Sequence, residues 1–134
     1  MQVAYREVEL TKRYPLRISR GEFSGSINLF VSISDGTVTG LGEAAPGNLT
    51  GADTAQLCQT QIEAFLDACP EALDSPHDGW LLAREQGLAS CAWAAVDIAL
   101  WDLLAKRARQ PLFRLLGLPR RAVATSVTVG ILPP

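Results

Sequence analysis

The sequence predicts an α+β domain in which a three-stranded antiparallel meander precedes a helical bundle. Three observations predict this class. Residues 26–34 alternate between apolar and polar side chains, the period of a half-buried strand, and Asp35-Gly36 follows at once, as in a tight hairpin. Residues 53–69 repeat apolar side chains at spacings of three and four, which indicates an amphipathic helix. Residues 91–105 are almost entirely apolar, as expected for a buried helix.

Composition agrees with a folded domain. Of the 134 residues, 48% are hydrophobic and 19% are charged, and the mean hydropathy is +0.14. This balance excludes intrinsic disorder, which requires low hydrophobicity and high net charge. No apolar run reaches the roughly 20 residues of a membrane span, so no membrane partner is expected. We therefore expect a soluble domain with more apolar surface than its length can bury.

The strands are expected in the first third of the chain. Asp35-Gly36 predicts a type I′ turn, because both central residues of that turn have positive φ, and residues 37–41 form the returning strand. Residues 3–10 alternate less regularly and change phase near Arg6-Glu7, which indicates a first strand with a β-bulge. Two loops are expected to interrupt this region, at residues 17–25 and 42–51.

The first helix is expected to begin at Asp53. An aspartate is a good N-cap, and Gln56 three residues later completes a capping box. Pro70 ends the helix, since proline cannot continue it. The following segment is rich in turn-forming residues and contains a short helix near residues 79–85.

The helix at residues 91–105 is the most informative element. Only Asp97 and Asp102 are polar in it, so it belongs inside a body larger than one helix and one small sheet. A short turn at residues 112–116 follows. Residues 125–131 are β-branched and alternating, which predicts a final strand with no partner in the chain.

Charge is unevenly distributed along the chain. Residues 1–102 hold all fourteen acidic residues and six basic ones, whereas residues 103–134 hold six basic residues and no acidic one. A basic tail can mark a nucleic-acid interface. Lys106, Arg107 and Arg109 instead stand where a helix ends, and cations there interact favourably with the helix dipole. We therefore expect no nucleic-acid partner.

The cysteines and the N-terminus bear on the compartment. Cys58, Cys69 and Cys91 are odd in number and widely spaced, which predicts neither a disulfide framework nor a zinc site. Residues 1–10 carry three charged side chains and lack the apolar core of a signal peptide. A cytoplasmic location is expected.

Residues 92–117 closely resemble the signature helix of the mandelate racemase/muconate lactonizing enzyme group of the enolase superfamily. The match includes Ala-Val-Asp-x-Ala-Leu-Trp-Asp at residues 95–102 and Pro-Leu-x-x-Leu-Leu-Gly at residues 111–117. Gly-Leu-Gly-Glu at residues 40–43, with Pro46, resembles the second capping loop of that group. The resemblance implies an enolase N-terminal-like cap that packs over a C-terminal (β/α)7β barrel.

The resemblance also implies a domain division. Residues 1–119 would be the capping domain with its linking helices. Residues 120–134 would be a linker and the first strand of a truncated barrel, because a barrel takes about 250 residues. The C-terminal barrel domain is thus an expected partner, and the protein is expected to form a homo-oligomer.

Within the group, residues 15–21 and 125–129 look most like dipeptide epimerases of the Ala-Glu type. That resemblance implies that Arg20, in the first capping loop, meets a substrate carboxylate. It also implies that Thr128, on the first barrel strand, lies near the substrate. Caps of muconate cycloisomerases, succinylbenzoate synthases and N-acylamino acid racemases are similar, so these activities are alternatives.

The reaction implied by the resemblance removes a proton α to a carboxylate, with Mg²⁺ stabilising the enolate. Lysine bases and three metal-binding carboxylates would belong to the barrel. The chain contains only Lys12 and Lys106, which form no pair, and no acidic residue follows Asp102. We expect the parent protein to be an isomerase and this chain alone to be inactive, with no catalytic or metal-binding residue. The alternative is a stand-alone module that binds a small ligand or partner through its apolar face.

The remaining polar residues are expected to be structural. Asp97 and Asp102 are five residues apart and do not share a helix face, so each would hold neighbouring backbone or a partner. Glu43 would anchor its loop through hydrogen bonds. His77 would be exposed to solvent in a turn.

Overall fold

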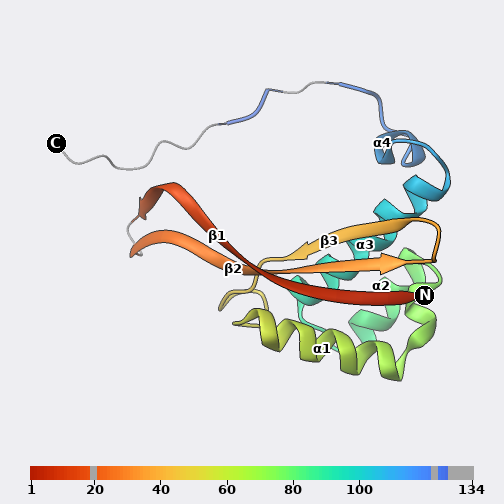
Figure 1. The fold of residues 1–134 in the computed structure, drawn as a ribbon, viewed down its shortest axis with the longest axis horizontal. Helices are drawn as coiled ribbons and strands as arrows, with labels where there is room; N and C mark the ends of the chain where they lie inside the picture. The colour runs from red at the N-terminus through yellow and green to blue at the C-terminus, as the bar shows by residue number, and fades with distance from the viewer. Residues whose placement is uncertain (19–20, 122–123, 127–134) are drawn as a thin grey trace.

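The computed structural model describes residues 1–18, 21–121 and 124–126. Three antiparallel strands form one sheet in the order β1-β2-β3, and helices cover one of its faces (Figure 1). The predicted α+β class and the meander are confirmed. The strands are β1 (Gln2–Ile18), β2 (Gly21–Ser34) and β3 (Thr39–Ala44). The helices are α1 (Ala55–Ala68), the 3-10 helix η1 (Pro70–Leu73), α2 (Pro76–Glu85), α3 (Ser90–Arg107) and α4 (Leu112–Leu115).

The first two strands are longer than expected. Most of the loop expected at residues 17–25 is strand, and the expected bulge near Arg6-Glu7 is absent, because pairing runs without a shift from Gln2↔Ser34 to Thr11↔Gly25. The register shift lies further on, between Thr11 and Leu16. Pro15 stands in this interval and has no N–H for the ladder, which gives the irregularity a physical reason.

The turn between β2 and β3 also differs from the expected type I′ turn. Gly36 has a positive φ of 91°, but Asp35 does not, and β3 resumes only at Thr39. The Asp35 carboxylate instead accepts hydrogen bonds from the backbone N–H groups of Thr37 (2.8 Å) and Val38 (2.9 Å). This side chain closes a longer turn than a two-residue hairpin needs.

The sheet packs directly against α3. Leu29, Val31 and Ile33 of β2 are fully buried beneath the helices. β3 approaches α3 so closely that a Cβ on Gly42 would lie 1.9 Å from the carbonyl oxygen of Ala95. The absence of a side chain at this glycine lets strand and helix backbones meet.

The first helix begins one residue later than expected. Thr54, not Asp53, is the N-cap, and its side chain accepts a hydrogen bond from Leu57 N–H at 3.1 Å. Gln56 completes no capping box; its amide donates to Glu7 of β1 at 2.8 Å. Adjacent Asp and Thr are both acceptable caps, so the sequence alone does not separate them.

The later elements follow expectation with small changes in their bounds. α2 starts at Pro76, three residues earlier than expected, with Ser75 as its N-cap. α3 extends slightly beyond residues 91–105 at both ends, and nine of its residues are buried. Residues 124–126 form no strand, and most of the strand expected at residues 125–131 lies outside the described residues.

Candidate functional site

The β1–β2 hairpin extends well past the helical layer, toward the left of Figure 1. We call its far half, residues 11–18 and 21–27, the outer hairpin. Every residue of β2 from Gly21 to Ile27 is exposed, whereas buried residues begin at Asn28. The outer hairpin therefore has no core of its own beneath it and offers both faces for contact with another body.

Aromatic rings and cations gather on the outer hairpin. Tyr14 is 70% exposed and Phe23 is 44% exposed. Lys12 Nζ lies 5.9 Å from the centre of the Phe23 ring, and the Arg13 guanidinium lies 5.4 Å from that of Tyr14. These contacts hold the rings while leaving them accessible. Such a surface can contact apolar groups and attract a carboxylate.

One ion pair crosses the outer hairpin near its tip. Arg17 donates to the Glu22 carboxylate through Nη2 at 2.7 Å and through Nε at 3.1 Å. Arg17 and Glu22 are partners in the strand register. This two-point contact fixes the direction of both side chains, although both remain exposed to solvent and contribute little to stability.

The segment between β3 and α1, residues 45–54, forms a second structured loop. Gly47 N–H donates to the Ala52 carbonyl at 2.9 Å, and the Thr50 hydroxyl donates to the Gly47 carbonyl at 2.8 Å. Ser90, at the start of α3, donates from its hydroxyl to the Thr50 carbonyl at 3.1 Å. Leu49 is 82% exposed at the top of this closed turn.

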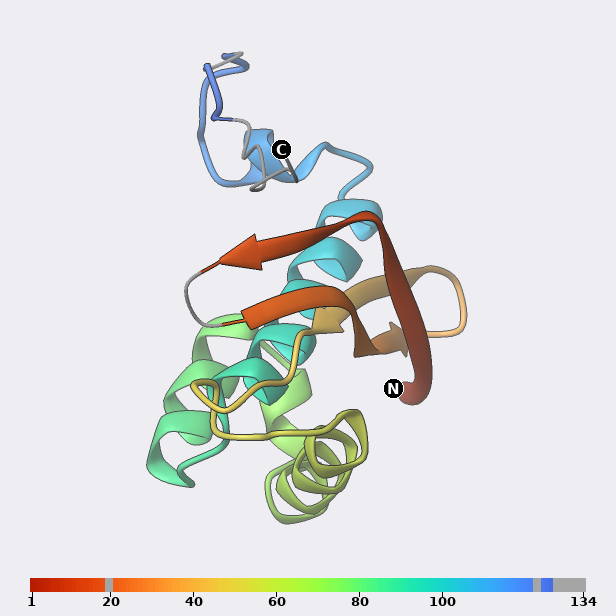
Figure 2. The ribbon, with the colours of Figure 1, turned by 90° about the vertical axis from the view of Figure 1, so that its left-hand side faces the viewer.

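The outer hairpin and the 45–54 loop lie at the same end of the molecule, the end that faces the viewer in Figure 2. Both present apolar side chains to solvent, and both are positioned by polar contacts. Sequence reasoning selected these two regions as loops but did not select Tyr14, Phe23 or Leu49. The signal that could have identified these three residues is a large apolar side chain in a segment without a buried face, which is typical of a contact surface.

The two site residues expected from the resemblance, Arg20 and Thr128, lie outside the described residues. The assignment of both to a substrate site stays a prediction. Arg17 and Glu22, on either side of the hairpin tip, are described and show where the chain enters and leaves it.

Asp102 holds neighbouring backbone, as expected, whereas Glu43 lies within β3 and contacts β2 instead of anchoring a loop. Asp102 Oδ2 accepts hydrogen bonds from Leu41 N–H at 2.9 Å and from Lys106 Nζ at 2.6 Å. Lys106 also donates to the Thr39 carbonyl at 2.8 Å. The hydrogen bonds of Asp102 and Lys106 thus join α3 to the edge strand β3. The Glu43 carboxylate accepts from the Asn28 amide at 2.6 Å, a contact between strands.

Asp97 lies between α2 and α3, apart from the outer hairpin and the 45–54 loop. It is half-buried, and burial is the main cause that raises the pKa of its carboxyl group above 3.8, opposed by a hydrogen bond from Trp101 and by the charge of His77. His77 is exposed, as expected, but it lies in helix α2 and not in a turn. Its ring stands edge-on to Trp101 with centroids 5.2 Å apart. The described residues around this cluster come from α2 and α3.

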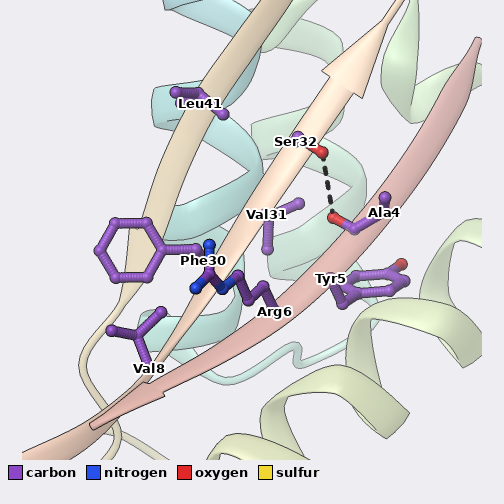
Figure 3. Close-up of a pocket in the computed structure, with 8 residues that line it drawn as sticks. All are labelled: Ala4, Tyr5, Arg6, Val8, Phe30, Val31, Ser32 and Leu41. Carbon is purple, nitrogen blue, oxygen red and sulfur yellow. Dashed lines mark hydrogen bonds between the residues drawn. The ribbon is translucent and has the colours of Figure 1, made fainter.

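A shallow groove occupies the sheet face that the helices leave uncovered (Figure 3). Phe30 and Leu41 border it, and Arg6 is the one charged residue among those that line it. Ser32 donates from its hydroxyl to the Ala4 carbonyl at 3.4 Å, and Tyr5 points toward α1. Among the described residues that line the groove, no nucleophilic side chain lies beside a base. The groove therefore offers mainly van der Waals contact with apolar groups.

The described residues do not fit a resident metal ion. Over residues 1–18, 21–121 and 124–126, no three His, Cys, Asp or Glu side chains gather where they could hold one. Within the same residues, no helix is long and apolar enough to cross a membrane.

The sheet, the buried helix α3 and the outer hairpin, which has no core beneath it, define an α+β domain. Residues 1–117 match the family described as mandelate racemase / muconate lactonizing enzyme, N-terminal domain. The chain belongs to this family, as the resemblance of its α3 segment implies.

Relatives of this chain carry a shared description. A protein of Roseobacter litoralis, named hydrophobic dipeptide epimerase, is 55% identical over the whole chain, and one of the same name from a Flavobacteria bacterium is 44% identical. The chain spans 38% of the length of each. A solved dipeptide epimerase from Cytophaga hutchinsonii, complexed with Mg and D-Ala-L-Val, is 25% identical with a TM-score of 0.80. That match covers 96% of this chain and 36% of the solved one.

Proposed function

We propose that this chain is the substrate-covering N-terminal part of a magnesium-dependent dipeptide epimerase. The observation that carries the proposal is the 55% identity, over the full chain, to a protein named hydrophobic dipeptide epimerase. Because the chain spans 38% of that relative's length, we assign the metal, its carboxylate ligands and the bases to a C-terminal barrel of the parent protein. Residues 1–119 would form the cap, and residues 120–134 would lead into the barrel.

The outer hairpin and the 45–54 loop would close over the dipeptide. Tyr14, Phe23 and Leu49 are exposed there and would exclude water from the substrate, which strengthens electrostatic interactions in the closed site. Neither lysine of the chain is placed to act as a base, since Lys12 lies over Phe23 and Lys106 is bonded to Asp102. This chain would bind and cover the dipeptide, while residues of the barrel would remove and return its α-proton.

We propose dipeptides with hydrophobic side chains as the substrate class, in place of the Ala-Glu type expected from short loop motifs. The relatives at 55% and 44% identity are both named hydrophobic dipeptide epimerases, and the apolar residues exposed at the covering end agree with this class. Arg20 would then meet the terminal carboxylate that every dipeptide carries, and Thr128 would lie beside the substrate. A homo-oligomeric, cytoplasmic protein remains our prediction.

The test is α-proton exchange by the full-length protein with Mg²⁺ in D₂O, followed by ¹H NMR. Dipeptides of two hydrophobic residues should lose an α-proton signal and yield the epimer, and should do so faster than L-Ala-L-Glu. Faster exchange of L-Ala-L-Glu would refute the substrate class alone. Absence of exchange in every dipeptide, with turnover of N-acyl amino acids, would refute the epimerase assignment.

Arg20 has a test of its own in the full-length protein. If Arg20 binds the terminal carboxylate, Arg20→Ala should raise KM for dipeptides and leave KM unchanged for their C-terminal amides. Arg17→Ala is the matched control, because Arg17 is already paired with Glu22. Equal effects of Arg20→Ala on acids and amides would remove Arg20 from the site.

A further inference from the structure

Two cysteines from different helices bring their sulfur atoms together in the core. Cys58 lies in the first turns of α1 and Cys91 is the second residue of α3, yet their Sγ atoms are 3.2 Å apart. Both are free thiols, with Cys58 fully buried and Cys91 6% exposed. A disulfide has an S–S distance of about 2.05 Å, so the two sulfurs need to approach by roughly 1.2 Å.

The pair stands at the base of the 45–54 loop. Cys91 N–H donates to the Thr50 carbonyl at 3.4 Å, and its sulfur lies 4.0 Å from the Ala52 carbonyl oxygen. Cys58 N–H donates to the Thr54 carbonyl at 3.0 Å. Cys91 therefore contacts the loop through its backbone, whereas the Cys58 bond closes the first turn of α1, where the loop ends. A bond between the sulfurs would join the two helix starts that contact the loop.

We propose that Cys58 and Cys91 form a reversible disulfide, with a peroxide as oxidant, that locks the 45–54 loop to α1 and α3. One sulfur attacks a peroxide oxygen, the O–O bond breaks, and a sulfenic acid and water result. The second sulfur then attacks the sulfenic sulfur, the S–S bond forms, and a second water leaves. Two thiols and one hydrogen peroxide thus give one disulfide and two waters, and the two electrons pass to the peroxide oxygens.

Burial assigns the order of these steps. Both residues are buried, and Cys91, the more exposed of the two, would be the first to meet peroxide. Burial, with a further contribution from Cys91, raises the pKa of Cys58 to about 12, so Cys58 is the poorer nucleophile and reacts second, its proton leaving with the sulfenic hydroxyl as water while the S–S bond forms. A bulky disulfide cannot reach either sulfur, which makes a small peroxide the fitting oxidant.

The cross-link is tested by treating the protein with hydrogen peroxide, alkylating the remaining thiols and mapping the peptides by mass spectrometry. The peptides that contain Cys58 and Cys91 should be joined, with a mass two hydrogens below their sum, and dithiothreitol should separate them. Cys69, also buried, should stay alkylatable. Full alkylation of Cys58 and Cys91, a sulfinic acid at Cys91, or a bond to Cys69 would each overturn the proposal.

Matched variants separate the bond from general damage. Cys69→Ala should keep the cross-link, whereas Cys91→Ala should lose it, each compared by circular dichroism with the untreated protein. Oxidation should raise the melting temperature by roughly 10 °C in the wild type and in Cys69→Ala. An unchanged melting temperature in the cross-linked protein would refute the proposal that the disulfide locks the 45–54 loop to α1 and α3.

The effect on the loop's role rests on the proposed function, but the cross-link does not. Peptide mapping detects the disulfide whether or not the protein turns over dipeptides. The cross-link can therefore be confirmed even if the epimerase assignment is wrong. If the loop covers substrate, oxidation should lower kcat of the full-length protein at least twofold and dithiothreitol should restore it. Unchanged turnover by cross-linked protein would overturn regulation through the loop.

Discussion

The two halves of β2 have the same partner strand and opposite surroundings. From Gly21 to Ile27 every residue is exposed, while Leu29, Val31 and Ile33 are fully buried against the helices. Backbone pairing with β1 is enough to define strand in both halves. Only the inner half also buries apolar surface, which is the main favourable term in folding. Stability therefore resides in the inner half, and the outer half, which buries no apolar residue of β2, is accessible for contact with another body.

The largest expected effect lies where β3 meets α3. Gly42→Ala would place a Cβ 1.9 Å from the Ala95 carbonyl oxygen, within backbone that cannot yield. We expect a loss of about 3 kcal/mol or more in the free energy of unfolding, since an overpacked core is strained. Urea unfolding followed by circular dichroism measures it.

Gly47→Ala is the control for that substitution, because a Cβ at Gly47 would meet nothing within 4 Å. Its free energy of unfolding should stay within about 0.5 kcal/mol of the wild type. Equal losses for Gly42→Ala and Gly47→Ala would show that the inner sheet does not depend on close contact with α3.

A smaller loss is expected when the polar link between α3 and β3 is removed. Asp102→Ala takes away the acceptor of Leu41 N–H and the partner of Lys106. Because this carboxylate is 34% exposed, we expect a cost of about 1 to 2 kcal/mol, seen as a lower urea midpoint.

Asp97→Asn is the matched control on the same helix. Burial raises the pKa of Asp97 in the folded state, so its charge disfavours folding as pH rises through that pKa. Asp97→Asn should therefore be at least as stable as the wild type at pH 7, with any gain lost below about pH 4. Parallel losses in Asp97→Asn and Asp102→Ala would contradict the different roles assigned to the two aspartates.

Much of the inner half is predictable from sequence, and most of the outer half is not. Alternation over residues 26–34 exists because one face is buried, and the apolar run of α3 exists because it is buried on most sides. From Gly21 to Gly25 every residue is exposed, so the strand leaves no periodic signal there and the segment looks like a loop. Tyr14 and Phe23 likewise become candidate contact residues only when the structure shows that the hairpin extends beyond the helical layer.

Details of turns and caps fall between these extremes. Asp35-Gly36 marks a turn correctly, but the type I′ geometry was wrong because the Asp35 side chain bonds the backbone two and three residues ahead. Asp53 and Thr54 are both acceptable caps, and the choice depends on the backbone that enters the helix. The contact between Cys58 and Cys91 depends on helix packing, which spacing along the chain does not reveal.

The β2–β3 turn should show a pH dependence of its own. Hydrogen bonds from the backbone of Val38 and from Arg107 lower the pKa of Asp35 from 3.8 to about 2. A lowered folded-state pKa adds stability that is present above the unfolded value and is lost as pH falls from about 4 toward 2. The urea midpoint of the wild type should fall over this range more steeply than that of Asp35→Asn. Parallel pH profiles would contradict the role given to the Asp35 carboxylate.

The smallest effect on stability is expected at the outer hairpin. Phe23→Ala removes a ring that is 44% exposed and lies near Lys12 Nζ outside the core, so the free energy of unfolding should change by no more than about 0.5 kcal/mol. Leu29→Ala, six residues further along the same strand, empties a fully buried position and should cost about 2 to 5 kcal/mol. In the full-length protein Phe23→Ala should instead raise KM for hydrophobic dipeptides, measured by α-proton exchange. A large stability loss with unchanged KM would mean that the outer hairpin supports the fold and does not contact substrate.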